Sequence, residues 1–376
     1  MLIGNFFKKI NPEFKNHYFS GINFNSQLCK KNDIFFAIKG NQFDGNKFIF
    51  DAISRGAKTI IHEKKFQGFK NGILYLSLVN VRKGLAELSY KLFNPKINNL
   101  IAVTGTNGKS SICNFYFQIL NLNKKKVASL GTLGIKTQSK NLKATNTTMN
   151  SLHLSKYLKY LSDKKIDNVI LEASSHGLKQ HRLDGLKFKK GIFTNLSHDH
   201  LDYHKSYNDY LNAKLYLFKN LLADKATIIT DKDIPEYKNI LTISKKKKAS
   251  LKTISKQNGQ IKVLEHKYFG EKQYLKIKYK NLKFSFYLNL IGKIQIKNLF
   301  MAILAAESRS LNFKKIVKVL SKIKPVNGRL EKIGKLKNKA ICILDYAHTP
   351  EALELCLRNI KEQFVNKNIS IVLGCG

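Results

Sequence analysis

The stretch TGTNGKSS at residues 104–111 contains the residue types that a phosphate-binding loop requires. An apolar run precedes it and a second apolar segment follows it, which is the strand, loop and helix order of such loops. Glycines let backbone N–H groups approach a phosphate, and a helix N-terminus adds partial positive charge. Lys109 can neutralise β- and γ-phosphate charge, and the Ser110 hydroxyl can bind Mg²⁺. The strict pattern has Gly where this chain has Val103, so a tight turn without a ligand remains an alternative.

A second group of candidate residues comes from the middle of the chain, where six of the ten histidines lie close together. Glu172 ends one apolar run, and His198, Asp199 and His200 follow another. Ligands of open α/β sheets bind at the carboxyl ends of the strands, and a carboxylate with an imidazole there can bind Mg²⁺. A zinc hydrolase that uses His198, His200 and His204 is the rival interpretation, but it leaves the phosphate loop unexplained.

A parallel sheet must bring these residues together. Apolar runs that alternate with helical stretches predict an α/β fold with a central doubly wound, P-loop-bearing sheet. Period-two alternation at 273–289 predicts a small antiparallel piece, and the apolar run at 368–376 predicts a buried strand. The strands expected in the central sheet lie within 100–104, 125–132, 167–174, 189–195 and 225–230, and the helices between them within 110–122, 151–164 and 207–222.

Punctuation by Pro, Gly and Asn divides the chain into three expected domains. Residues 1–96 read as a small N-terminal α/β domain, 97–324 as the central domain, and 325–376 as the start of a third. A parallel-sheet domain of only about 50 residues is too small to enclose its own core. We therefore expect the third domain to be an incomplete Rossmann-like domain.

The composition excludes several classes of protein. No apolar run approaches the ~20 residues that span a bilayer, and no signal peptide is evident, so a cytoplasmic protein without a membrane partner is expected. Five widely spaced cysteines indicate reduced thiols rather than disulfides or a cysteine zinc site. The net charge of +42 comes mostly from lysines scattered along the chain, which favours compositional drift over a nucleic-acid-binding face. A basic, nucleotide-dependent nucleic-acid binder stays as an alternative.

Several stretches resemble, in order, those of the Mur ligase family, the ATP-dependent amide-forming enzymes that build the peptidoglycan stem peptide. They are TGTNGKSS, TNTTMNS, LEASSHGLKQHRLDG, NLSHDHLDYH, YLNAKLYLF, NGRLEKI and LDYAHTPEALE, and FNSQLCKKNDIFFAIKGNQFDG resembles the family's N-terminal UDP-sugar domain. The resemblance covers essentially the whole chain and implies a three-domain architecture. SSHGL and DYAHTP favour the members that add a diamino acid, here expected to be meso-diaminopimelate, to UDP-N-acetylmuramoyl-L-alanyl-D-glutamate.

The resemblance also implies roles for individual residues. ATP would be held by Gly105, Thr106, Asn107, Gly108, Lys109, Ser110 and Ser111, with Asn298, Arg329 and Asp345 at its adenine, ribose or phosphates. Mg²⁺ would be held by Ser110, Glu172, His200 and Lys214, where Lys214 matches a lysine that family members carry as a carbamate. The UDP-linked substrate would be held by Ser26, Asn41, Gln42, Phe43, Asn146, Thr147, Thr148, Ser174, Gln180 and Arg182. Catalysis would rest on Lys109, Lys214 and His200.

Without the resemblance, Lys214 would be expected to be an ordinary solvated lysine. The family's mechanism has two steps, in which ATP converts a carboxylate to an acyl phosphate and an amine then attacks it. A monomer without a nucleic-acid partner is expected.

Two departures from the family pattern matter. Ser110 replaces the usual Thr, and either hydroxyl can bind Mg²⁺. The chain also stops before the family's Arg-bearing loop and acceptor-selecting motif. If Gly376 is the natural end, the acceptor pocket is missing; if it is not, the choice between diaminopimelate and lysine cannot be read. Another Mur step or a folylpolyglutamate-synthase-type ligase is the second hypothesis.

Overall fold

The fold comes from a computed structural model that describes residues 1–7, 10–40, 43–197, 199 and 203–374. The chain divides into two compact units. The first unit comprises Met1–Lys96, Met149–Asp163 and Lys179–Leu186, and the second comprises Ile97–Thr148, Lys164–Leu178 and Lys187–Gly376. The domain boundaries expected at 96 and 324 stay predictions.

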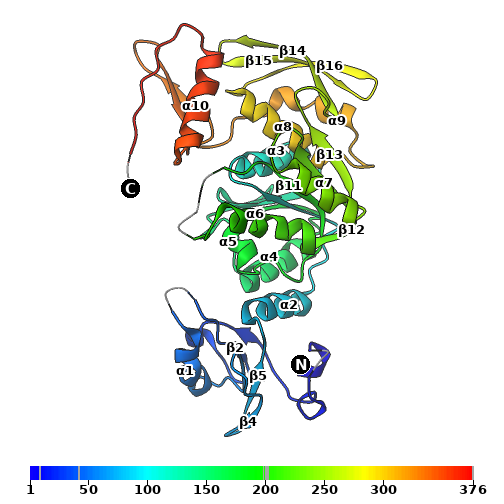
Figure 1. The fold of residues 1–376 in the computed structure, drawn as a ribbon, viewed down its shortest axis with the longest axis vertical. Coiled ribbons are helices and arrows are strands. Elements are labelled where there is room, and N and C mark those ends of the chain that lie inside the picture. Colours follow the sequence, from blue (N-terminus) through cyan, green and yellow to red (C-terminus); the bar gives the residue numbers. More distant parts are fainter. Residues whose placement is uncertain (8–9, 41–42, 198, 200–202, 375–376) are drawn as a thin grey trace. The chain divides into compact units, whose positions relative to one another are not determined.

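The first unit is built on a five-stranded sheet with the order β1-β2-β3-β5-β4, in which only β4 runs antiparallel to its neighbour. Buried side chains such as Phe36, Leu74 and Leu85 form its core, and Leu152 joins them from a distant part of the sequence. Helices α2 and α4 lie side by side (Figure 1). The strands are β1 Ile22–Asn23, β2 Ile34–Phe36, β3 Thr59–His62, β4 Gly68–Lys70 and β5 Ile73–Ser77; the helices are α1 Ile49–Ser54, α2 Val81–Phe93 and α4 Ser151–Asp163; and four 3₁₀ turns are η1 Ile3–Asn5, η2 Pro12–Phe14, η3 Ser26–Leu28 and η4 Gly45–Phe48.

The second unit is built on an eight-stranded sheet with the order β13-β12-β11-β6-β10-β7-β8-β9. The six strands from β13 to β7 are parallel, and β8 and β9 extend the edge antiparallel. Their almost continuous burial explains the unbroken apolar runs in the sequence. The predicted central doubly wound sheet is confirmed. The strands are β6 Asn99–Thr104, β7 Val127–Gly131, β8 Gly134–Lys136, β9 Asn141–Leu142, β10 Asn168–Glu172, β11 Phe188–Phe193, β12 Leu222–Asp231 and β13 Ser250–Ile254.

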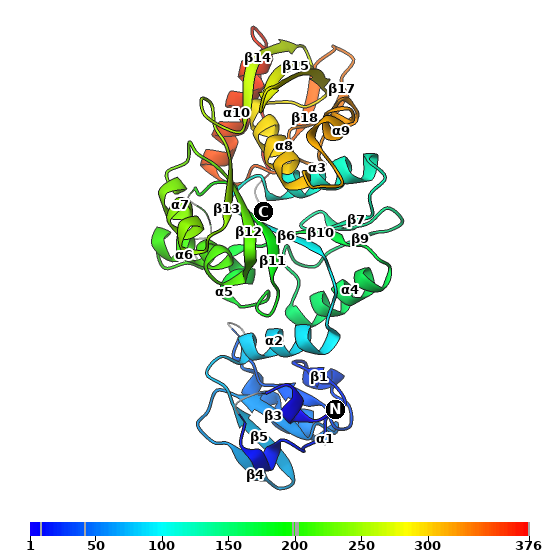
Figure 2. The same ribbon diagram turned by 90° about the vertical axis from the view of Figure 1, so that its right-hand side faces the viewer.

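Helices of the second unit pack on this sheet and on each other. Helix α8 lies beside α3 (Figure 2). Buried side chains of both helices belong to one large core. Helix α6 continues into the π-helical turn η5, so the predicted helix 207–222 is two pieces. The helices and turns are α3 Lys109–Leu122, α5 Ser175–Lys179, α6 Tyr207–Tyr216, η5 Leu217–Leu221, α7 Tyr237–Lys246, α8 Lys293–Ala306, α9 Phe313–Val317, η6 Leu320–Lys322 and α10 Pro350–Gln363.

Two small antiparallel sheets complete the second unit. Strands β14 Ile261–Phe269, β15 Lys272–Tyr279 and β16 Leu282–Leu288 form the piece predicted from period-two alternation. Strands β17 Glu331–Lys335 and β18 Ile341–Leu344 pair near the C-terminal end. The strand predicted over 368–376 is wrong for the described residues 368–374, which form no strand and are exposed. An apolar run becomes a strand only where a neighbour accepts its backbone hydrogen bonds, and none of the described strands pairs with it.

Candidate active site

The loop between β6 and α3 has the backbone that the glycines in its sequence suggested. Gly105 has φ +140° and Gly108 has φ +88°, conformations that other residues rarely adopt. A Cβ on Gly105 would lie 1.8 Å from the Thr194 Oγ1, and one on Gly108 would lie 2.5 Å from the Asn298 Oδ1. Only glycine fits at either place, because both the space and the backbone exclude a side chain.

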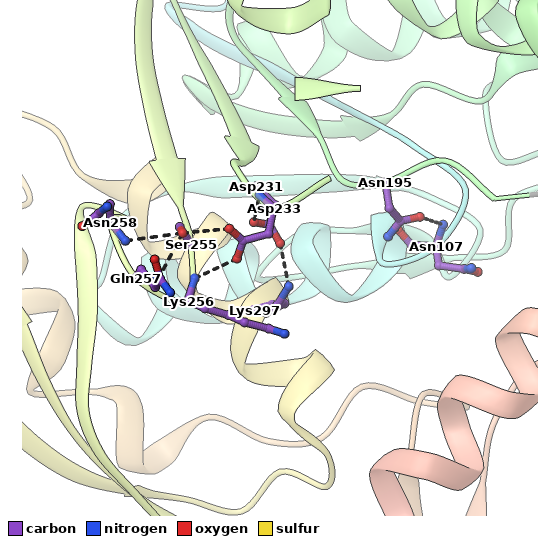
Figure 3. Close-up of polar contacts among 9 residues, drawn as sticks. All are labelled: Asn107, Asn195, Asp231, Asp233, Ser255, Lys256, Gln257, Asn258 and Lys297. Carbon is purple, nitrogen blue, oxygen red and sulfur yellow. Dashed lines mark hydrogen bonds and ion pairs between the residues drawn. The ribbon is translucent and has the colours of Figure 1, made fainter. Parts of the chain in front are cut away.

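The end of β11 holds this loop through residues that the sequence analysis did not single out. The backbone N–H of Asn107 donates to the Asn195 Oδ1 at 3.0 Å (Figure 3). The Thr106 N–H donates to the Asn195 carbonyl at 2.9 Å, and the Thr194 hydroxyl donates to the Asn107 carbonyl at 2.6 Å. The available signal was an Asn at the carboxyl end of a predicted strand, where ligand sites of α/β sheets form.

Lys109 lies inside the loop that it follows. Its Nζ donates to the carbonyls of Gly105 and Thr106, at 2.8 Å each. Burial lowers the pKa of Lys109, against the opposing effect of the carboxylates of Glu172 and Asp199. The cation is therefore held at the loop, beside two acidic groups that favour its charged form.

Glu172 supplies the acidic side of the site from the end of β10. Its side chain is buried, with Oε1 accepting from the Thr132 N–H at 2.9 Å and Oε2 accepting from the Thr132 hydroxyl at 3.2 Å. A Cβ on Gly131 would lie 2.1 Å from the Glu172 Oε1, so a glycine there makes room for the carboxylate. Glu172, Ser110 and Asp199 line one cavity.

Lys214 reaches the same loop from α6. Its side chain is 1% exposed, and its Nζ donates to the Gly105 carbonyl at 2.8 Å. The Nζ also lies 4.2 Å from the centroid of the Tyr210 ring. Burial lowers the pKa of Lys214 well below its ordinary value, and the nearby Lys109 charge adds to this. The expectation of a solvated lysine is wrong. The role that the resemblance implies for Lys214 stays a prediction, and the position of its buried Nζ at the P-loop is compatible with that role.

The far wall of the cavity comes from α8 and from the segment around β17 and β18. Asp345 accepts a hydrogen bond from the Leu330 N–H at 2.7 Å, and the Arg329 guanidinium lies 4.6 Å from the centroid of the Tyr346 ring. Burial raises the pKa of Asp345, and the Leu330 hydrogen bond and the Arg329 charge oppose this. The cavity has a volume of about 230 Å³, and the predicted nucleotide residues Asn298, Arg329 and Asp345 all line it. The structure thus places these three residues and the P-loop around one cavity.

Three of the predicted UDP-substrate residues gather beside Glu172. The Thr148 hydroxyl donates to the Glu172 carbonyl at 2.8 Å and accepts from the Ser174 N–H at 2.9 Å. The Thr147 Oγ1 lies 3.1 Å from the Thr132 Oγ1. Thr147 and Ser174 line the same cavity as the P-loop. Asn146 is exposed just before them.

The remaining predicted UDP-substrate residues lie in the first unit. The Arg182 guanidinium donates to the Gln180 Oε1 from Nε at 3.1 Å and from one terminal nitrogen at 2.7 Å. Ser26 is buried in η3, and Phe43 is 71% exposed. Asn41 and Gln42 lie outside the described residues, so their predicted role is untested.

The metal site that the sequence predicts lies only partly within the described residues. Among them, no group of three or more His, Cys, Asp or Glu side chains is arranged to hold a metal ion. The predicted ligand His200, with His198 of the zinc alternative, lies outside the part of the chain that the structure describes. His204 is buried, with its ring 5.0 Å from the Tyr210 ring and its Nδ1 3.5 Å from an Asp209 oxygen.

Known domain families match successive parts of the chain. The Mur ligase family catalytic domain matches residues 18–88, the Mur ligase middle domain matches 103–306, and the Mur ligase glutamate ligase domain matches 328–376. In the sequence, the first match precedes the middle domain and the last match follows it. The resemblance of individual motifs thus extends to whole domains.

Relatives and solved structures agree with these matches. UDP-N-acetylmuramoyl-L-alanyl-D-glutamate--2,6-diaminopimelate ligase of Rickettsia prowazekii (strain Madrid E) is 34% identical over 98% of this chain and 76% of its own length. The ligase of the same name from Wigglesworthia glossinidia brevipalpis is 36% identical over 95% of this chain and 74% of its own length. A solved structure of a ligase of that name has a TM-score of 0.82 at 25% identity, covering 97% of this chain and 75% of that one. MurF of Thermotoga maritima shares the fold, with a TM-score of 0.63 at 20% identity over 90% of this chain and 74% of that one.

A P-loop with a buried lysine and a buried carboxylate beside it defines an enzyme that acts with a nucleoside triphosphate. Together with the matched domains, that class is the ATP-dependent ligases. The chain belongs to the Mur ligase family. The predicted three-domain architecture and the predicted likeness to the diamino-acid-adding branch, known as MurE, are confirmed.

Proposed function

We propose that this ligase joins a diamino acid, meso-diaminopimelate, to UDP-N-acetylmuramoyl-L-alanyl-D-glutamate in peptidoglycan synthesis. The observation that carries the proposal is the convergence of Lys109 and Lys214 on the carbonyl of Gly105, at 2.8 Å each, beside Glu172. The names of relatives that are 34% to 36% identical support the choice of substrates. In the described part of the chain, no helix has the length and apolarity needed to cross a bilayer.

The proposed reaction has two steps. In the first, an oxygen of the D-glutamyl γ-carboxylate attacks the γ-phosphorus of ATP, the bond to the β-phosphate oxygen breaks, and ADP leaves. In the second, the amine of the diamino acid attacks the acyl carbon, inorganic phosphate leaves, and the nitrogen loses a proton. ATP thus supplies the leaving group that a free carboxylate lacks.

The P-loop residues have a direct part in the first step. Backbone N–H groups at the start of α3 are proposed to bind phosphate oxygens, because the first turn of a helix has no intrahelical carbonyl to accept from them. Lys109 balances the negative charge that spreads over the transferring phosphoryl group. Its hydrogen bonds to the carbonyls of Gly105 and Thr106 keep the Nζ at the loop before the nucleotide arrives.

Lys214 fits the proposed carbamate. Only a neutral amine attacks CO₂, and burial lowers the pKa of Lys214 well below its ordinary value. The N–C bond forms as the neutral amine loses a proton, which converts an uncharged group next to Lys109 into an anion. The carbamate attracts the Lys109 ammonium, whereas a protonated Lys214 would repel it, so the surroundings favour the carbamate.

The oxygen-rich groups of the cavity fit Mg²⁺. The carboxylate of Glu172 and the hydroxyl of Ser110 are ligands of the kind that Mg²⁺ prefers, and carbamylated Lys214 would add a third oxygen donor. In the described part of the chain, each Glu172 oxygen accepts one hydrogen bond, both from Thr132, which leaves lone pairs for a cation. When bound, Mg²⁺ would neutralise phosphate charge. His200 remains a proposed further ligand.

The substrate side of the site stays a proposal residue by residue. Thr147, Thr148 and Ser174 are proposed to hold the dipeptide near the γ-phosphate, because their hydroxyls surround the end of β10. Gln180 and Arg182 are proposed to bind the UDP-linked substrate, with Ser26, Asn41, Gln42 and Phe43 at the uridine and Asn146 beside the threonines. A cytoplasmic location suits a reaction between UDP-linked and ATP substrates.

A substrate screen tests the proposal and its alternatives. With ATP, Mg²⁺ and the UDP-linked dipeptide, mass spectrometry should detect a product extended by diaminopimelate, and not by glutamate as a folylpolyglutamate-type ligase would give. Lys109→Met should abolish the product, and Lys124→Met, an exposed lysine beyond the end of α3, should leave it unchanged. No product with either diaminopimelate or lysine would overturn the proposal. Tight DNA or RNA binding with a steep salt dependence would favour the nucleic-acid alternative.

A further inference from the structure

Helix α8 contacts two parts of the second unit through neighbouring residues. The Lys297 Nζ donates to the Asp231 Oδ2 at 2.6 Å, and Asp231 is the last residue of β12 (Figure 3). The next side chain, Asn298, is buried and lies against the P-loop, where a Cβ on Gly108 would be 2.5 Å from its Oδ1. Two successive residues of α8 therefore contact the carboxyl end of β12 and the phosphate loop.

The Lys297–Asp231 pair is better fixed than an ordinary surface ion pair. The Asp231 side chain is 4% exposed, and its second oxygen accepts from the Asp233 N–H at 2.9 Å. A buried carboxylate that loses its cation is strongly destabilised, so Asp231 holds Lys297 in place. The Lys297 side chain is 39% exposed, which leaves its position dependent on this contact.

The loop that follows Asp231 is held by hydrogen bonds to the loop that follows the neighbouring strand β13. Asp233 accepts from the Ser255 hydroxyl at 2.9 Å and from the Lys256 N–H at 2.8 Å (Figure 3). These bonds join the loop after β12 to the loop after β13. Asp231 therefore presents its carboxylate from the end of a strand whose following loop is held by these hydrogen bonds.

We propose that Lys297 and Asp231 are positioning residues for the nucleotide, which set the rotation of α8 and so hold Asn298 against the P-loop. Successive residues of an α-helix point about 100° apart, so a helix anchored at one position has the direction of the next position fixed. The inference rests on the proposed nucleotide site and deepens it. Neither Lys297 nor Asp231 lines the cavity, so both act through Asn298.

Binding measurements on the intact chain test the positioning role. Isothermal titration calorimetry gives separate dissociation constants for ATP with Mg²⁺ and for the UDP-linked dipeptide. Asp231→Asn and Lys297→Met should each weaken ATP binding about five- to tenfold, and the double variant should be no weaker than the weaker single one, because both changes remove one interaction. Binding of the UDP-linked dipeptide should not change. Lys297→Arg should restore ATP binding to within about twofold.

A matched control separates this pair from a general effect of removing a lysine from α8. Lys293 on the same helix pairs with Glu362 at 3.0 Å, with both side chains substantially exposed. Lys293→Met should leave ATP binding unchanged. If Asp231→Asn and Lys297→Met both bind ATP within about twofold of wild type, the positioning role is overturned and the proposed nucleotide site is not affected. A double variant that binds both ATP and the UDP-linked dipeptide more weakly and unfolds at a lower temperature would also overturn the inference. A wild-type chain that binds no ATP would instead overturn the proposed nucleotide site on which the inference rests.

Discussion

Gly108 is a residue whose backbone conformation can be tested against the proposed nucleotide site. Gly108→Ala would place a Cβ 2.5 Å from the Asn298 Oδ1 in a backbone with φ +88°. We expect this variant to lose most of its ATP affinity, because either the loop or Asn298 must move. A binding titration with ATP measures the effect.

The control for this variant is Gly270→Ala. Gly270 also has a positive φ, +58°, but a Cβ there meets nothing within 4 Å. We expect it to lower the free energy of unfolding by about 1 kcal/mol, the cost of a left-handed residue, and to leave ATP affinity unchanged. Equal ATP affinity of Gly108→Ala and Gly270→Ala would contradict the crowding described at the P-loop.

Lys214 carries a second prediction at the scale of one residue. Lys214→Ala should abolish ligation, and a short carboxylate such as acetate should restore part of it, because the missing group is proposed to be an anion. Labelled bicarbonate should give a carbamate carbon signal in the wild type by ¹³C NMR. The signal should be absent in Lys214→Ala and present in Lys219→Ala, which changes an exposed lysine in η5. A wild-type chain without that signal would contradict carbamylation.

At the scale of elements, the start of α8 depends on side chains from α10. The N–H of Ile294 donates to the Asn359 Oδ1 at 3.0 Å, and that of Gly292 donates to the Gln363 Oε1 at 2.8 Å. Both α10 side chains are buried, and they satisfy backbone donors that the helix cannot satisfy itself. Asn359→Leu should lower the free energy of unfolding by about 1 to 2 kcal/mol, measured by chemical denaturation. The exposed neighbour change Glu362→Gln should cost less than about 0.5 kcal/mol, and an equal cost would contradict the capping role.

The other end of α8 gives a prediction about pH. The Lys190 Nζ on β11 donates to the carbonyl of Ala305 and, at 3.0 Å, to that of Glu307. Burial lowers the pKa of Lys190 from 10.5 to about 8, with the Lys252 charge adding to this and Glu307 opposing it. Between pH 8 and 10.5 the unfolded chain therefore binds more protons at this group than the folded chain, so this group makes stability rise with pH.

Comparison with Lys190→Met isolates that contribution. The difference in unfolding free energy, wild type minus variant, should increase as the pH rises from 8 to 10.5, measured by denaturant titration at each pH. Subtracting the variant removes the other lysines and tyrosines that titrate in this range. A difference that stays constant or falls over this range would contradict a lowered pKa at Lys190.

At the scale of the whole molecule, the sequence predicted those features that depend on local order. The P-loop, the doubly wound sheet and Glu172 at a strand end follow from motif spacing and apolar runs. The burial of Lys214 and the support from Asn195 could not be read, because both depend on contacts between segments about 90 to 110 residues apart. The strand expected at 368–376 failed for a related reason, since pairing needs a neighbouring strand that periodicity does not report.

The central claim is that ATP activates the γ-carboxylate of the D-glutamyl residue in the P-loop cavity. Trapping with hydroxylamine tests it most directly, because hydroxylamine converts an acyl phosphate to a stable hydroxamate without any acceptor amino acid. Mass spectrometry should detect the hydroxamate of the UDP-linked dipeptide with one ADP per molecule, only when ATP and Mg²⁺ are present, and not with Lys109→Met. Binding of both ATP and the UDP-linked dipeptide without any hydroxamate or ADP would contradict the account.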